Sequence, residues 1–106
     1  TTVRVPVLNS HSESINVELA RPYDLAIVKQ QMSALEGLVV QDDPAHNIYP
    51  MASTSAGKND VFVGRMRRDD SVENGLNLWV VADNIRKGAA TNTVQIAKYM
   101  IEHEMV

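Results

Sequence analysis

The sequence predicts an α+β fold, and three observations lead to this prediction. Short segments with apolar residues at every second position indicate strands in both halves of the 106-residue chain. Two other segments have apolar residues at helical spacing, one in the first half and one at the C-terminal end. The resulting order is strand, strand, helix, strand, strand, strand, helix, which favours an α+β layer over a βαβ repeat.

The first two strands are expected near the N-terminus. Valine occupies every second position of residues 3–7, which is typical of a strand with one buried face. Apolar and polar residues alternate again over residues 15–19. We expect these two strands to pair as a hairpin that bends at residues 9–12, so that His11 lies at the rim of the sheet and outside the core.

A helix, a short strand and a long loop follow. Pro22 suits the first turn of a helix, apolar residues recur at positions 25, 28, 32 and 35, and Gly37 is a natural C-terminal stop. Residues 38–41 are a short strand candidate. Residues 42–60 are rich in Pro, Asn, Ser, Gly and Asp and are expected to form a loop, and a loop of this length in a compact domain usually has a function or covers a partner.

Two more strands and a final helix complete the chain. The strands are expected at residues 61–69 and 75–84, joined by a polar turn through Asn74 and Gly75. Residues 88–105 are predicted to be helical, with one apolar stripe formed by Ala90, Val94, Ala97 and Ile101.

Composition limits the classes of function. The net charge of -3 argues against a sequence-independent grip on nucleic acid, and no apolar run is long enough for a membrane span. The absence of cysteine excludes disulfides, thiolate metal sites and a cysteine nucleophile within these residues, and it fits a cytoplasmic location. Because the chain starts inside an expected strand and without methionine, we expect it to be a piece of a longer polypeptide.

Arg4 and His11, seven positions apart, form the first candidate site. One interpretation is that Arg4 binds a substrate carboxylate with its planar fork while His11 acts as an acid and base near neutral pH. The other is that Arg4 lies on an exposed strand face and His11 is a polar turn residue. The spacing alone favours the second interpretation.

The segment NIRKGAATN, residues 84–92, is the second candidate. A glycine followed by small residues at the start of a helix leaves backbone N–H groups free for an anion or for the edge of a cofactor. Ordinary helix initiation with close packing explains the same pattern and is favoured by it. No glycine-rich phosphate-binding fingerprint occurs in the chain.

Other charged residues have simpler explanations. The basic residues at positions 65, 67 and 68 are followed by two aspartates, which is typical of a solvated strand face, although a phosphate or partner contact stays open. His46 and His103 have no partner at a metal-ligand spacing and are expected at the surface.

Three long stretches together resemble the C-terminal part of bacterial aspartate-semialdehyde dehydrogenases, most closely the Gram-positive type. They are RVPVLNSHSESINVEL at residues 4–19, NIYPMASTSAGKNDVFVGRMRRDDSVENGLNLWVVADN at residues 47–84 and RKGAATNTVQIA at residues 86–97. The resemblance implies a mixed-sheet catalytic domain of the glyceraldehyde-3-phosphate-dehydrogenase-like C-terminal type. Residues 1–85 would belong to this catalytic and dimerisation domain, and residues 86–106 would be a helix that returns to the Rossmann domain.

The resemblance also implies an activity and its residues. The family reduces L-4-aspartyl phosphate to aspartate semialdehyde with NADPH, in the biosynthesis of lysine, threonine and methionine. The family's substrate-carboxylate arginine and acid/base histidine fall on Arg4 and His11, and the histidine would take the proton of the hemithioacetal hydroxyl. Asn84 matches a position near the nicotinamide end of NADP, with Gly88 and Asn92 assigned more loosely. The implied partners are this small-molecule substrate and further copies in a dimer or tetramer, with no nucleic acid and no membrane.

One departure from the family is large. The Rossmann domain, the nucleophilic cysteine and the phosphate-binding residues lie upstream in the family, and this chain has no cysteine. We therefore expect the chain to be inactive alone and to contribute part of the site to a complete enzyme that includes the Rossmann domain and the catalytic cysteine. The alternative is an isolated, non-catalytic fragment that acts only as a folding or dimerisation module.

Overall fold

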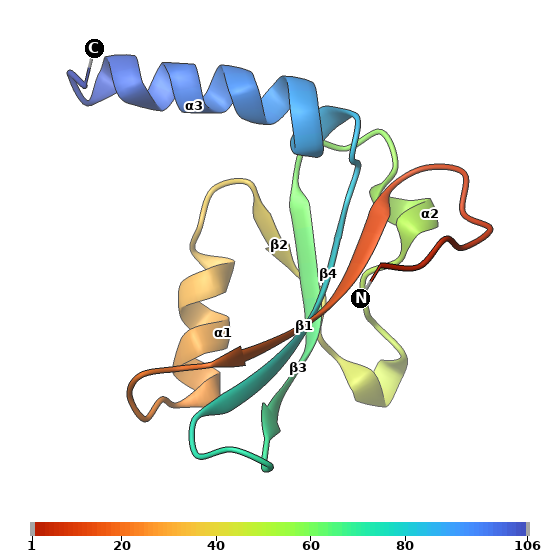
Figure 1. The fold of residues 1–106 in the computed structure, drawn as a ribbon, viewed down its shortest axis with the longest axis vertical. Helices are drawn as coiled ribbons and strands as arrows, with labels where there is room; N and C mark the ends of the chain where they lie inside the picture. The colour runs from red at the N-terminus through yellow and green to blue at the C-terminus, as the bar shows by residue number, and fades with distance from the viewer. Residues whose placement is uncertain (1, 106) are drawn as a thin grey trace.

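In the computed structural model, which describes residues 2–105, four strands form one mixed sheet in the order β1-β4-β3-β2 (Figure 1). The β3–β4 hairpin lies at the centre, β1 pairs antiparallel with β4, and β2 pairs parallel with β3. The sheet and its helices therefore confirm the predicted α+β fold. The strands are β1 (His11–Glu18), β2 (Leu38–Val40), β3 (Val61–Asp69) and β4 (Gly75–Ala82).

The buried core belongs to the central hairpin. Its two strands alternate side chains between the two faces of the sheet, and both faces are covered near the middle of the hairpin. The buried apolar side chains are Phe62, Val63, Met66, Leu76 and Val81. The sequence prediction of β2, β3 and β4 is confirmed, with β4 ending at Ala82 instead of Asn84.

The predicted N-terminal strand is wrong. Residues 2–10 have no strand structure, and the side chains of Val3 and Val5 are 73% and 54% exposed. Consequently there is no hairpin at residues 9–12, and His11 is the first residue of β1, opposite Ala82 of β4. Pro6 has no N–H to donate to a sheet, and β1 finds its partner in the distant β4. His11 is exposed, so its expected place outside the core is confirmed.

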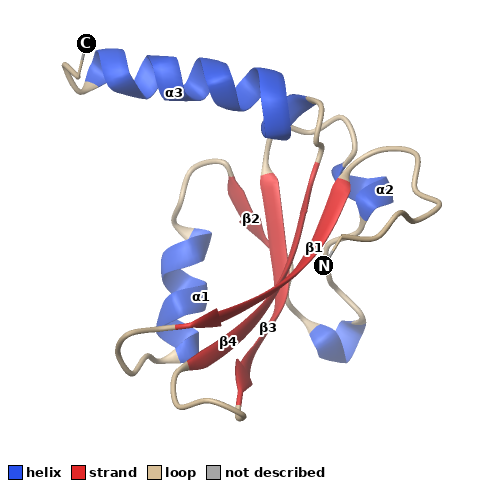
Figure 2. Ribbon diagram, viewed as in Figure 1, coloured by secondary structure: helices blue, strands red, loops and turns tan. Residues whose placement is uncertain are grey.

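The helix α1 (Leu25–Ser33) covers one face of the sheet and contacts β2 and β3 (Figure 2). The Asp24 side chain caps it by accepting hydrogen bonds from the N–H groups of Ala26 at 2.7 Å and Ile27 at 3.2 Å. The chain leaves the helix through Gly37, whose φ of +77° suits a residue without a side chain. The predicted helix is therefore confirmed, starting three positions after Pro22.

The expected loop at residues 42–60 contains two short helices, η1 (Pro44–His46) and α2 (Ala52–Ser55). Figure 1 shows α2 and the N-terminal segment on the side of the sheet opposite α1. The indole N–H of Trp79 on β4 donates to the carbonyl of Pro50 at 2.9 Å, and Pro50 and Ser55 are buried. This segment thus packs on the second face of the sheet.

The C-terminal helix stands away from the sheet. A π-helical turn, η2 (Arg86–Ala90), leads into α3 (Thr91–Glu102), which extends beyond the end of the strands (Figure 1). No residue of α3 is buried, and Val94 and Ile101 of its apolar stripe are each 68% exposed. The predicted helix is confirmed. None of the helices within residues 2–105 is long and apolar enough to cross a membrane.

Candidate functional site

The pairing of β1 with β4 brings two distant candidate residues together. His11 opens β1 opposite Ala82, the last residue of β4, so residues just before β1 lie beside residues just after β4. The backbone N–H of Ser10 donates to the side-chain oxygen of Asn84 at 3.1 Å. The predicted acid/base residue and the predicted cofactor residue therefore share one end of the sheet.

Ser10 has an unusual backbone conformation directly before His11. Its φ of 78° lies in the left-handed region, which costs energy for a residue with a side chain. Besides the bond to Asn84, its hydroxyl lies 3.3 Å from the hydroxyl of Ser55, which is buried. These contacts hold Ser10 in a conformation that it would not favour by itself.

Asp83 connects the same end of the sheet to two neighbouring segments. Its carboxylate accepts from the N–H groups of Ile85 at 2.9 Å and Arg86 at 3.0 Å, which caps the start of η2. The other carboxylate oxygen accepts from the N–H of Gly57 at 2.7 Å, in the turn after α2. The Gly57 bond and then the Arg86 bond favour the charged carboxylate and lower the pKa of Asp83.

Gly88 and Asn92 lie further along the same segment. The N–H of Gly88 donates to the carbonyl of Asp83 at 3.2 Å, and Asn92 lies in the first turn of α3. A Cβ built on Gly88 would meet only Asn84, at 3.7 Å, so nothing else among the described residues fills the space beside this glycine. The oxygen of Asn84 is used by Ser10, whereas its amide NH2 bonds to no other described residue. This open, polar surface fits the edge of a planar cofactor.

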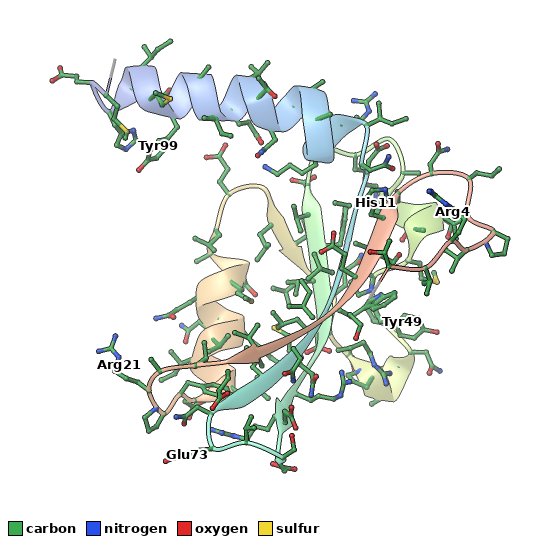
Figure 3. All side chains as sticks on the ribbon, in the orientation of Figure 1. Arg4, His11, Arg21, Tyr49, Glu73 and Tyr99 are labelled. Carbon is green, nitrogen blue, oxygen red and sulfur yellow. The ribbon has the colours of Figure 1, made fainter. Side chains whose placement is uncertain are left out.

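Arg4 and His11 are both exposed (Figure 3). Arg4 lies on the irregular N-terminal segment and His11 at the start of β1. Arg4 takes part in none of the ion pairs within the part of the chain that the structure describes. Both side chains are therefore accessible to a ligand, although none of the ion pairs between described residues involves either of them.

Three members of this site were not predicted from the sequence: Ser10, Ser55 and Asp83. Asp83 had a signal, because an aspartate just before a helical segment is a preferred N-cap. Ser10 and Ser55 had none, since their approach depends on the packing of α2 against the end of β4.

The sheet face opposite α1 carries an open groove of about 760 Å³, which the sequence did not predict. The basic strand positions do not form one face, because successive strand residues point to opposite sides of the sheet and Arg67 and Arg68 are neighbours in regular register with β4. Arg65, with φ of 52°, and Arg67 face this groove, whereas Arg68 stacks on Tyr23 beside α1, 4.4 Å from the ring centre. The groove is lined by, among others, Tyr49, Met51, Arg65, Arg67 and Trp79.

The two remaining histidines interact with residues three or four positions away in the sequence. His46 lies 2.6 Å from the Asp43 carboxylate, and the His103 ring stacks on Tyr99 with centres 3.9 Å apart. Both are exposed, as the sequence predicts. Between residues 2 and 105, no group of three or more metal-ligating side chains comes together.

Comparison with known proteins agrees with the sequence resemblance. Residues 1–87 match the model of the family described as semialdehyde dehydrogenase, dimerisation domain. The chain is 45% identical over its whole length to aspartate-semialdehyde dehydrogenase of Aquifex aeolicus, covering 31% of that protein. It is 50% identical over 94% of its length to the Legionella pneumophila enzyme, of which it covers 29%.

Solved structures show the same fold. The crystal structure of aspartate semialdehyde dehydrogenase II from Vibrio cholerae, complexed with ASA, matches 93% of this chain at a TM-score of 0.84 and 42% identity. The chain covers 29% of that structure, and it spans 29 to 31% of the relatives named above. The family match over most of the chain leads to one conclusion: the chain belongs to the semialdehyde dehydrogenase family and contains its dimerisation domain.

Proposed function

We propose that this chain is the C-terminal part of an NADP-dependent aspartate-semialdehyde dehydrogenase, to which it supplies Arg4 for substrate binding and His11 for proton transfer. The observation that carries the proposal is the hydrogen bond between Ser10 and Asn84. It links the residue before the exposed His11 to the residue proposed to meet the cofactor. The family match supports the same assignment.

Arg4 has the chemistry needed to hold the α-carboxylate of aspartyl phosphate or aspartate semialdehyde. A guanidinium donates two parallel hydrogen bonds to a carboxylate, which fixes its orientation as well as its position. The Arg4 side chain is exposed and enters no ion pair within residues 2–105, so it is available for this role.

His11 has the chemistry needed for the proton. Histidine exchanges protons near neutral pH, and the neutral ring can accept the proton of a substrate hydroxyl that is being oxidised. In the biosynthetic direction the protonated ring returns it. The position of His11 at an open strand end leaves its ring accessible to a bound substrate.

Asn84, Gly88 and Asn92 would hold the nicotinamide end of NADP, which supplies hydride transfer when bound. The free amide NH2 of Asn84 and the open space beside Gly88 support this assignment. Asn92 is placed with them because it follows Gly88 by about one helical turn.

The complete enzyme needs groups that this chain lacks. The chain has no cysteine, so the acyl-accepting thiolate would come from the rest of a larger polypeptide, together with the Rossmann domain. We place residues 1–85 in the catalytic and dimerisation domain and residues 86–106 in a helix that returns to the cofactor domain. The exposed apolar stripe of α3, which no other element of the described chain covers, supports this division.

Homodimerisation would use the groove face of the sheet. Trp79, Tyr49 and Met51 give that face apolar area, and Arg65 and Arg67 give it charge. This combination is typical of an interface between subunits, where aromatic residues, methionine and arginine are enriched.

The test uses the full-length protein in which these residues occur. We expect it to reduce NADP+ in the presence of aspartate semialdehyde and phosphate, with the rate abolished when either is omitted. An intact full-length protein without this turnover would contradict the proposal. If the natively purified protein is instead a single 11.7 kDa species, the absence of cysteine favours the second candidate, a non-catalytic dimerisation module.

A further inference from the structure

Two routes, each made of hydrogen bonds and a short piece of backbone, lead from Asp83 to Ser10, the residue before His11. In the first, Asp83 caps the turn that contains Ile85 and Arg86, and the adjacent Asn84 side chain accepts from the N–H of Ser10. In this way the capped turn fixes the amide that holds the Ser10 backbone.

The second route runs through the turn after α2. The other oxygen of Asp83 accepts from the N–H of Gly57 at 2.7 Å, two residues after Ser55. The Ser55 hydroxyl is 3.3 Å from the Ser10 hydroxyl, and Ser55 is only 1% exposed. Asn84 therefore holds the backbone N–H of Ser10, and Ser55 holds its hydroxyl. Asp83 joins the two segments that carry these partners.

The conformation of Ser10 explains why such support is needed. A serine at φ of 78° relaxes to a negative φ unless its surroundings prevent it. Because Ser10 immediately precedes His11, relaxation would change the direction in which the chain enters β1. The His11 ring would then leave the strand at a different position relative to Asn84.

We propose that Asp83 is a positioning residue for His11, acting through Asn84 and Ser55 on the strained backbone of Ser10. This proposal rests on the proposed function, in which His11 transfers the proton. Asp83 itself is 6% exposed, and both of its carboxylate oxygens are engaged by backbone N–H groups. None of the hydrogen bonds that its carboxylate makes with described residues goes to His11, so its effect on that ring is indirect.

The principal test is Asp83→Asn in the full-length enzyme. An asparagine replaces one accepting oxygen with a donating NH2, so either the Gly57 bond or the cap of η2 is lost. We expect kcat to fall about 10- to 100-fold, because small displacements of a catalytic group have effects of this size. The KM for aspartate semialdehyde should stay within about twofold, since Arg4 lies outside the network.

Rescue distinguishes positioning from general damage. Glycine adopts a left-handed φ without strain, so adding Ser10→Gly to Asp83→Asn should restore part of the lost kcat. Asp69→Asn is the matched control, because the Asp69 carboxylate is also engaged by several donors, from Ser71 and Asn16, at the opposite end of β3. It should leave kcat unchanged.

Several outcomes would overturn the proposal. These are a normal kcat in Asp83→Asn, an equal loss in Asp69→Asn, or no recovery with Ser10→Gly. If Asp83→Asn does not fold, Asp83→Ser keeps a capping oxygen while removing the acceptor for Gly57, and the same comparisons apply. His11→Asn distinguishes failure of the proposed function from failure of the positioning role. Normal turnover in His11→Asn would contradict the proposed function. A large loss of turnover in His11→Asn together with normal turnover in Asp83→Asn would contradict only the positioning role of Asp83.

Discussion

The backbone N–H of Ser10 donates to the side chain of Asn84 at 3.1 Å, although the two residues are 74 positions apart in the sequence. This bond is a consequence of strand pairing. Because β1 starts opposite the end of β4, the segment that enters one strand meets the segment that leaves the other. This end of the sheet thereby brings together the residues proposed for proton transfer and for cofactor binding, and their roles can be tested residue by residue.

Arg4→Lys should raise the KM for aspartate semialdehyde about tenfold with a smaller effect on kcat. A lysine provides one point charge where the arginine provides a planar fork, and losing one charge-assisted hydrogen bond costs about 1.5 kcal/mol. Steady-state kinetics of the full-length enzyme measure this. Arg21→Lys is a matched control, since Arg21 is also exposed but lies in the loop between β1 and α1 (Figure 3). An unchanged KM in Arg4→Lys would remove Arg4 from substrate binding.

His11→Asn should lower kcat by about 10²- to 10⁴-fold, the usual effect of losing a general acid/base group. Asparagine is polar and of similar size, so the exposed start of β1 should keep its structure. The same change at His46, which is exposed and pairs with Asp43, provides the control and should leave turnover normal. If both variants behave alike, His11 has no special role in proton transfer.

The residues of this site were named from a family resemblance, and the local patterns alone could not have joined them. Valine alternation in residues 3–7 predicted a strand, yet such alternation says nothing about which partner is available. β1 pairs instead with β4, more than half of the chain away, and the sequence carries no sign of that register. The proximity of the segments that carry His11 and Asn84 depends entirely on this register.

Elements whose cause is local were predictable. The helix α1 follows from its apolar spacing together with Gly37, and the β3–β4 hairpin follows from two apolar runs and a polar turn. The register shift between Gly64 and Arg67, where Arg65 has a φ of 52°, was not predictable, because no residue type in β3 indicates it. Local sequence patterns thus predict the helices and strands. What covers each face of the sheet, and the meeting of Ser10 with Asn84 at its end, depend on long-range packing.

Stability should decrease in acid through Asp83 and Asp69. Hydrogen bonds from Gly57 lower the pKa of Asp83, and those from Ser71 lower the pKa of Asp69. The unfolded chain therefore takes up these protons at a higher pH than the folded chain does. The stability that the two carboxylates contribute is fully present above their pKa in the unfolded chain, near pH 4. It is lost as the pH falls through their pKa in the folded chain. Chemical unfolding of the full-length protein at a series of pH values measures how steeply its free energy of unfolding depends on pH.

Asp83→Asn provides the comparison for that experiment. The variant has no titrating carboxylate at position 83, so its stability should depend less steeply on pH below about pH 4. It should also be less stable than the wild type at neutral pH, where the native carboxylate accepts three N–H groups. Identical slopes for the two proteins would show that Asp83 keeps an ordinary pKa in the folded state.

Arg67→Glu should weaken homodimerisation by at least about tenfold if the groove face forms the subunit interface. Arg67 lines the groove near Trp79 and Tyr49, and reversing its charge would bury an unmatched carboxylate against the partner surface. Sedimentation equilibrium of the full-length protein over a range of concentrations measures the dissociation constant. Arg21→Glu makes the same charge change outside the groove and should leave the dimer intact. A dimer of unchanged strength in Arg67→Glu would direct the search for the interface to the exposed apolar stripe of α3.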